Sequence, residues 1–263
     1  MMKSVRTLQA TRYVTPLREG GSLPAIVEAD DLGLYVVKFR GAGQGTLALV
    51  AEWIAGEIGR LLGFRVPELV LIDVDAALGR NEPDQEIRDL LQASAGLNLA
   101  LDYLPGSVTF DPAAGDMADA ETASRAVWFD SFITNVDRTA KNPNLLCWHR
   151  ELYFIDHGAA LYFHHNWPTA ERISRSRFAP VRHHILLPWA SKIEEANDSV
   201  LPLLTETALR DVISLVPEEW LRPASGVEAP PDPRAAYFEF FMRRLRAAPA
   251  FVEEAIRARA ELV

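Results

Sequence analysis

The chain has 263 residues, of which 49% are hydrophobic and 24% charged, a composition typical of a globular protein rather than a disordered one. Its 27 lysines and arginines against 36 aspartates and glutamates give a net charge of -9, which makes nucleic acid an unlikely partner because phosphate backbones select basic surfaces. The single cysteine, Cys147, excludes an internal disulfide and a thiolate zinc cluster, and no stretch approaches the ~18 apolar residues of a membrane span, so we expect a cytoplasmic protein.

The first predicted elements are short β-strands within residues 12–40. The runs LPAIVEA and LYVVKF are rich in strand-forming residues, and the turn residues 30–33 between them predict a hairpin. Gly20-Gly21-Ser22 stands between two of these strands. Glycines of this kind let backbone N–H groups point at a phosphate, although a turn without a ligand is the simpler interpretation.

Residues 47–62 predict a helix that is apolar on more than one side and therefore largely buried. Ahead of it, Lys38 lies in the apolar strand YVVKF, where its charge needs a partner. Glu52 and Glu57 on the helix are the candidates. They lie about 140° apart on a helical wheel, so only one of them can face Lys38, and the wheel alone does not choose.

The middle of the chain continues with predicted strands at residues 68–75 and 97–104 and a predicted helix at residues 122–136. From about residue 166 onward the sequence predicts mostly helix and carries no recognisable substrate signature. Strands with one helix come first and helices dominate later, which predicts an α+β fold that divides near Pro105.

The sharpest motif follows the helix at 122–136. Asp137 is followed five residues later by Asn142, and a predicted hairpin then ends in Asp156. Because a hairpin brings its two ends together, Asp156 should return close to Asp137 and Asn142. Their carboxylate and amide oxygens are suited to bind a hard divalent cation.

Together these features match the parts needed for phosphoryl transfer. A glycine-rich loop comes first, followed by a strand lysine with a helix glutamate, then an aspartate with an asparagine five residues on, and last a strand-end aspartate. No single match is specific, but the ordered set is. It predicts a phosphotransferase.

The same residues resemble a known family. GGSLP, VVKF, the run from Glu52 to Pro67, NVDRTAKNPNLL and FIDHG resemble the HipA-like kinases over roughly residues 15–165. The Asp-Arg-x-x-x-Asn spacing also resembles the catalytic loop of phosphatidylinositol kinases, a distant relative. HipA toxins carry an additional N-terminal subdomain, whereas this chain begins almost at the kinase core, so we do not carry over the toxin role.

The resemblance implies a bilobal protein-kinase-like fold with a β-rich N-lobe at residues 1–104 and a mainly helical C-lobe at residues 105–263. It also implies ATP and Mg²⁺ as cofactors and transfer of the γ-phosphoryl group to a hydroxyl, usually a Ser or Thr of a protein. Two alternatives stay open: a pseudokinase that binds nucleotide or a partner without turnover, and a small-molecule or lipid kinase. The acceptor itself, protein or small molecule, is unidentified.

Individual roles follow from the positions that match the family's motifs. Lys38 matches the lysine that holds the phosphates, Glu52 its helix partner, Asp137 the catalytic aspartate, and Asn142 and Asp156 the metal ligands. The resemblance also gives the expected contacts with the nucleotide, which are Gly20, Gly21 and Ser22 over the phosphates and Asp102, Tyr103 and Leu104 at the adenine.

Overall fold

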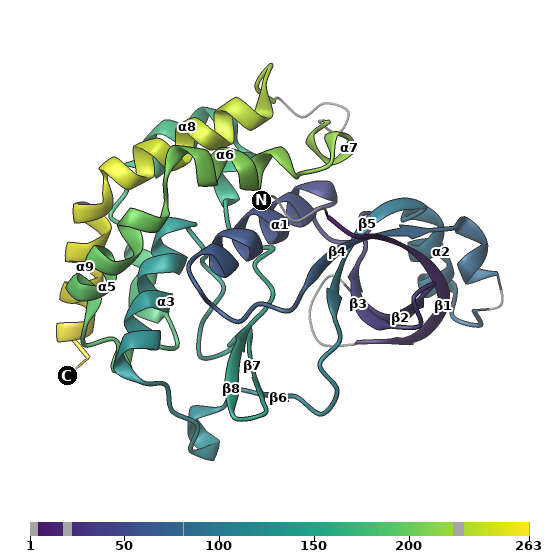
Figure 1. Cartoon of the computed structure of the whole chain (residues 1–263), viewed down its shortest axis with the longest axis horizontal. Helices are drawn as coiled ribbons and strands as arrows, with labels where there is room; N and C mark the ends of the chain where they lie inside the picture. Colours follow the sequence, from purple (N-terminus) through teal and green to yellow (C-terminus); the bar gives the residue numbers. More distant parts are fainter. Residues whose placement is uncertain (1–4, 18–22, 81, 223–228, 263) are drawn as a thin grey trace.

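The computed structural model describes residues 5–17, 23–80, 82–222 and 229–262. A small closed β-barrel forms the N-terminal part, and helices gather in the C-terminal part (Figure 1). The protein is therefore a mixed α+β molecule with a β-rich beginning and a helical end. Among the described residues, no helix is long and apolar enough to cross a membrane.

The barrel contains five strands in the order β1-β2-β3-β5-β4. The β1–β4 pair is parallel and the other pairs are antiparallel. The predicted hairpin at residues 30–33 is present and joins β2 to β3. The strands are β1 (Thr7–Pro16), β2 (Ala25–Ala29), β3 (Leu34–Lys38), β4 (Leu69–Val74) and β5 (Gly96–Asp102).

Alternation along the strands creates two apolar clusters. In β4, Val70 and Ile72 point into the barrel, whereas Leu69 and Leu71 point outward and pack in a second, larger cluster. Residues of α1 belong to that larger cluster, which also contains buried residues of the C-terminal helices. The outer face of the barrel is thus the surface against which α1 is fixed.

Helix α1 (Thr46–Leu61) is buried on most of its surface, as its apolar residues on several sides predict. It ends in a Schellman motif. The N–H of Phe64 donates to Gly59 O at 3.0 Å, and the N–H of Gly63 donates to Arg60 O at 3.0 Å. Gly63 has a φ of 83°, a conformation that glycine adopts without strain.

Helix α3 (Ala120–Phe132) ends four residues before the predicted boundary at residue 136. Thr134 adopts a left-handed conformation with a φ of 55°, and the N–H of Asn135 turns back to Asp130 O at 2.8 Å. The chain therefore leaves the helix before Asp137. A three-stranded sheet of β6 (Val108–Thr109), β7 (Leu145–Trp148) and β8 (Glu151–Phe154) follows, and β7 and β8 form the predicted second hairpin.

The C-terminal part is less regular than predicted. Residues 175–192, within the region predicted to be mostly helical, contain 3₁₀ turns instead of α-helix, and the helical stretch near the end of the chain is split at Ala247. Pro249 explains the split, because a proline is tolerated in the first turn of a new helix and not in the interior of a continuous one. The remaining α-helices are α2 (Gln85–Ala93), α4 (Ala170–Ser174), α5 (Ile193–Val200), α6 (Glu206–Ser214), α7 (Glu218–Leu221), α8 (Pro233–Arg246) and α9 (Ala248–Ala260). The 3₁₀ turns are Ala76–Gly79, Pro112–Ala114, Tyr162–His165, Trp167–Thr169, Ala179–His183, Leu187–Trp189 and Leu201–Leu203.

The short helix α7 connects the C-terminal part to α1 and to the barrel (Figure 1). Trp220 packs edge-on against Trp53 of α1, with ring centroids 6.5 Å apart, and its Nε1 donates to Leu97 O in β5 at 3.1 Å. Arg40, just after β3, pairs with Glu219 Oε2 at 2.7 Å. These contacts join residues before position 104 to residues after it. The division of the molecule into two lobes at this position stays a prediction.

Candidate active site

Lys38 lies at the end of β3 and points away from the barrel interior, because its neighbour Val37 occupies the inner position. Its Nζ contacts Glu52 Oε2 at 2.5 Å, and the Glu52 side chain has no exposed surface. The alternative partner, Glu57, instead lies 3.5 Å from the Nε of Arg60 on the same helix. The structure therefore places Glu52, rather than Glu57, against Lys38.

A carboxylate buried as deeply as Glu52 needs more than one partner. Its second oxygen, Oε1, lies 3.3 Å from Nδ1 of the buried His157. Burial by itself would raise the pKa of Glu52, but Lys38 and His157 outweigh burial and hold this pKa below its ordinary range. Burial would likewise lower the pKa of Lys38, but Asp156 and Glu52 raise it above the ordinary value. Both partners are therefore charged at neutral pH.

Asp156 follows β8 and meets the same lysine. Its Oδ1 lies 2.5 Å from Lys38 Nζ, while its side chain remains 45% exposed. Asp156 has a φ of 54°, a left-handed conformation that aspartate and asparagine adopt more readily than most residues. His157 is the next residue after Asp156. A ring of three side-chain contacts and one peptide bond therefore links Lys38, Glu52, His157 and Asp156.

Asp137 lies in the loop after α3. Its Oδ2 accepts hydrogen bonds from Asn142 Nδ2 at 2.6 Å and from Asn144 Nδ2 at 3.3 Å. The Asn144 amide also donates to Asp156 O at 3.4 Å, so it connects the Asp137 loop to the end of β8. Sequence reasoning did not single out Asn144. Its place two residues after Asn142, at the start of the hairpin, is the feature that could have indicated it.

The oxygens that remain suit a divalent cation. Asn142 uses its amide nitrogen for Asp137, which leaves its carbonyl oxygen, and Asp156 uses Oδ1 for Lys38, which leaves Oδ2. No group of three or more His, Cys, Asp or Glu side chains within the described ranges is placed to hold a metal ion. Two oxygen donors completed by phosphate oxygens and water match the way proteins hold Mg²⁺ with a nucleotide.

The expected nucleotide contacts are only partly described. Gly20, Gly21 and Ser22 lie outside the described residues. At the expected adenine contact, the N–H groups of Asp102 and Tyr103 already donate to Glu68 O and Leu34 O, at 2.9 and 3.0 Å. The N–H of Leu104 has no hydrogen-bond partner among the described residues, so it is the donor that this stretch offers a purine edge.

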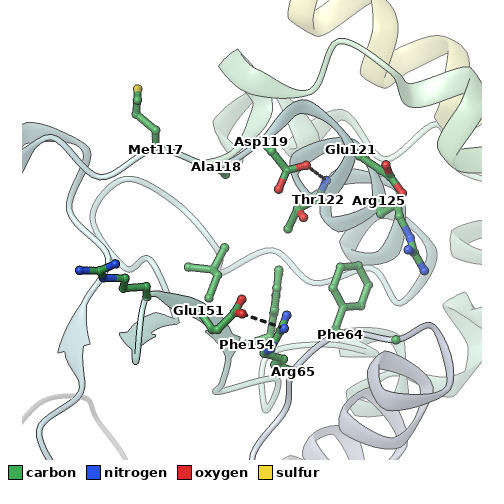
Figure 2. A pocket seen from close by; sticks show the side chains of 13 residues that line it. Phe64, Arg65, Met117, Ala118, Asp119, Glu121, Thr122, Arg125, Glu151 and Phe154 are labelled. Atoms are coloured by element: carbon green, nitrogen blue, oxygen red, sulfur yellow. Dashed lines mark hydrogen bonds and ion pairs between the residues drawn. The ribbon is translucent and has the colours of Figure 1, made fainter.

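A cavity of about 210 Å³ lies on another side of the hairpin, and Figure 2 shows the residues around it. Phe64, Leu152 and Phe154 give it apolar surface, and an ion pair between Arg65 Nη2 and Glu151 Oε1 at 3.0 Å stands at its edge. None of the residues predicted for the site lines this cavity. The site described above is therefore defined by its side-chain contacts and not by this cavity.

Comparison with known proteins identifies a matching family and similar solved structures. A family model described as HipA-like kinase matches residues 11–248. The crystal structure of a proinflammatory kinase of Helicobacter pylori, CtkA, is similar with a TM-score of 0.52 and 14% sequence identity, over 97% of this chain and 99% of that chain. At this identity the likeness concerns the fold alone. No curated protein matched the sequence.

Proposed function

This chain belongs to the HipA-like kinases, and from that premise we propose that it transfers the γ-phosphoryl group of Mg²⁺-bound ATP to a Ser or Thr hydroxyl of a protein. The observation that carries the proposal is the position of Lys38 Nζ between Glu52 and Asp156, 2.5 Å from each carboxylate. The lysine that would bind phosphate therefore contacts both its partner on the helix and a candidate metal ligand.

Lys38 is the group that would bind the phosphates. Glu52 orients it and is itself fixed by His157, so Lys38 need not reorganise when the nucleotide arrives. Lys38 would exchange its contact with the half-exposed Asp156 for one with phosphate oxygens, while its contact with the buried Glu52 remains. This exchange would free the Asp156 carboxylate for the cation.

Asp137 is the group that would receive the proton of the acceptor hydroxyl. Its Oδ2 is held by Asn142 and Asn144, which leaves Oδ1 for that hydroxyl. As the hydroxyl oxygen bonds to the γ-phosphorus, the bond to the ADP oxygen breaks and the proton passes to the carboxylate. Asn142 and Asp156 would hold the Mg²⁺, whose charge offsets the negative charge of the phosphates.

The test is transfer of label from γ-labelled ATP with Mg²⁺, followed over time for wild type, Asp137→Asn and Lys38→Met. We expect Asp137→Asn to lower the rate by at least about 100-fold while ATP still binds, because the amide cannot accept the proton. Asp211→Asn, an exposed position on α6, is the matched control and should transfer at the wild-type rate. Mass spectrometry of the labelled product identifies the acceptor residue.

Other outcomes have distinct meanings. ATP binding by the wild type without transfer to itself, to protein acceptors or to water would point to a pseudokinase. Label on a small molecule or lipid alone would replace the protein acceptor in the proposal. No binding of ATP at all would overturn the proposed function.

A further inference from the structure

A buried ion pair beside the site has no part in the chemistry proposed above. Arg138, the neighbour of Asp137, donates from Nε to Asp130 Oδ2 of α3 at 2.6 Å. Neither side chain has any exposed surface. Burying two charges costs desolvation energy, and their mutual attraction roughly offsets that cost. A contribution to stability alone therefore does not explain such a pair. Its hydrogen bonds indicate another role.

Arg138 reaches both ends of the β7–β8 hairpin. Its Nη1 donates to Asn144 O, just before β7, and to Ile155 O, just after β8, at 3.4 Å in the second case. Its guanidinium also lies over the ring of Phe154 in β8, 5.2 Å from the centroid. One planar group therefore holds the two chain segments that carry Asn142 and Asp156.

Asp130 fixes that planar group to the core. Its Oδ1 accepts from Asn135 Nδ2 at 3.0 Å, and its Oδ2 also accepts from His184 Nε2 at 2.8 Å. The N–H of Leu186 donates to His184 Nδ1 at 3.0 Å, so the ring proton is on Nε2. Burial would raise the pKa of Asp130, but Arg138 and His184 outweigh burial and hold it below the ordinary range, so Asp130 remains an anion.

We propose that Asp130 and Arg138 are positioning residues that set the separation of Asn142 and Asp156 and thereby the affinity for the divalent cation. This inference rests on the proposed use of Mg²⁺. It requires the forked geometry of arginine, because Nε binds Asp130 while Nη1 binds the two hairpin carbonyls. A lysine has one nitrogen and cannot reach all three oxygens.

The test compares Arg138→Lys with Arg244→Lys. Arg244 is a matched control because it is also buried, lies over a phenylalanine ring and donates to backbone carbonyls, those of Ser131 and Ser176, yet reaches neither end of the hairpin. Both variants replace the three nitrogens of a guanidinium group by the single amino nitrogen of lysine. Binding of Mn²⁺ is measured by EPR for each protein with a non-hydrolysable ATP analogue at saturation, so that the readout does not depend on turnover.

We expect Arg138→Lys to weaken Mn²⁺ binding by about 10- to 100-fold, a loss of the size seen when groups that orient metal ligands are removed. Arg244→Lys should bind Mn²⁺ as the wild type does. If Arg138→Lys fails to fold, Asp130→Leu combined with Arg138→Met removes both charges, leaves no unpaired ion and should show the same loss.

Equal Mn²⁺ affinity in the wild type and in a folded Arg138 variant would overturn the positioning role and leave the proposed function intact. An equal loss in Arg244→Lys would also overturn it, because the effect would then come from general loosening of the core. A wild type that binds the analogue but no Mn²⁺ would instead overturn the proposed metal site, and the positioning role with it.

Discussion

At the scale of single residues, the two carboxylates that contact Lys38 differ in how many of their oxygens have a hydrogen-bond donor. Glu52 is fully buried and has one donor on each oxygen, Lys38 on Oε2 and His157 on Oε1. Asp156 is half-exposed and binds Lys38 through one oxygen only. The first carboxylate is thus fixed, whereas the second can exchange its partner when a ligand arrives.

Glu52→Gln should lower kcat/KM for phosphoryl transfer by at least about tenfold, which corresponds to about 1.4 kcal/mol. A glutamine amide has one acceptor and one donor group, so it cannot accept from both Lys38 and His157. Glu57→Gln is the matched control on the same helix and should change kcat/KM by less than about twofold, since Glu57 faces Arg60. The measurement is steady-state kinetics with varied ATP, and equal effects of the two substitutions would contradict this account.

The residues of the site could largely be proposed from the sequence, but their contacts could not. The sequence itself shows the order in which the candidate residues follow one another, which is Lys38, Asp137, Asn142 and Asp156. The helical wheel could not choose between the two glutamates, because the choice depends on which face of β3 carries the lysine, and only the resemblance to the family selected Glu52. The proposed role of Arg138 was not visible either, because the groups that it binds on the hairpin are backbone carbonyls, which leave no pattern in the sequence.

At the scale of elements, the long regular segments were predictable and their ends were not. The helix at α1 and the two hairpins follow from apolar periodicity and turn residues. The early end of α3 depends on the left-handed Thr134 and on a backbone hydrogen bond to Asp130, which propensity does not describe. The 3₁₀ turns between residues 175 and 192 are held by tertiary contacts such as that of His184 with Asp130.

One junction between elements predicts a pH dependence of stability. His164 lies in the 3₁₀ turn Tyr162–His165, and its Nδ1 is 2.8 Å from the hydroxyl of Tyr237 in α8. Burial, together with His165, lowers the pKa of His164 to about 3. The unfolded chain takes up a proton near pH 6.5 and the folded one does not, so stability is complete above that pH and is lost as the pH falls from about 6.5 towards 3.

Between pH 7.5 and 5.0, His164 should account for a loss of about 2 kcal/mol in the free energy of unfolding. Urea denaturation at both pH values measures it. His164→Asn keeps a polar partner for Tyr237 but cannot titrate, so the loss should be smaller by that amount. His183→Asn, at an exposed position, is the control and should leave the loss unchanged. The same loss in His164→Asn and wild type would contradict the prediction.

At the scale of the whole molecule, α1 and α7 connect the barrel to the C-terminal helices. The barrel interior has its own apolar cluster, whereas α1 shares its cluster with the C-terminal helices. Trp220 joins these parts through the Trp53 ring and Leu97 O. Composition and element order predict the α+β class, but contacts between residues so distant in sequence are not readable from it.

Trp220→Ala should lower the free energy of unfolding by about 3–5 kcal/mol, the range for removing a large buried aromatic side chain. It should also speed amide hydrogen exchange in α1 more than in the barrel strands β2 and β3, because α1 loses its cover. Trp148→Ala is the control. This partly buried tryptophan also donates to a carbonyl, Pro105 O, but lies in the hairpin, so its loss should leave exchange in α1 unchanged. Uniform exchange across α1 and the barrel in Trp220→Ala would show that α7 does not connect them.

The position of Trp220 also bears on how the protein is made. Trp220 follows Leu97 by 123 positions. A ribosome that adds ~5–20 residues per second needs about 6–25 seconds to cover that interval. During this time the barrel strands have been synthesised, but the face of α1 that carries Trp53 has no covering helix. Nascent or prematurely terminated chains that stop before α7 therefore present an apolar helix to chaperones and proteases, and this surface is hidden only after α7 has been synthesised.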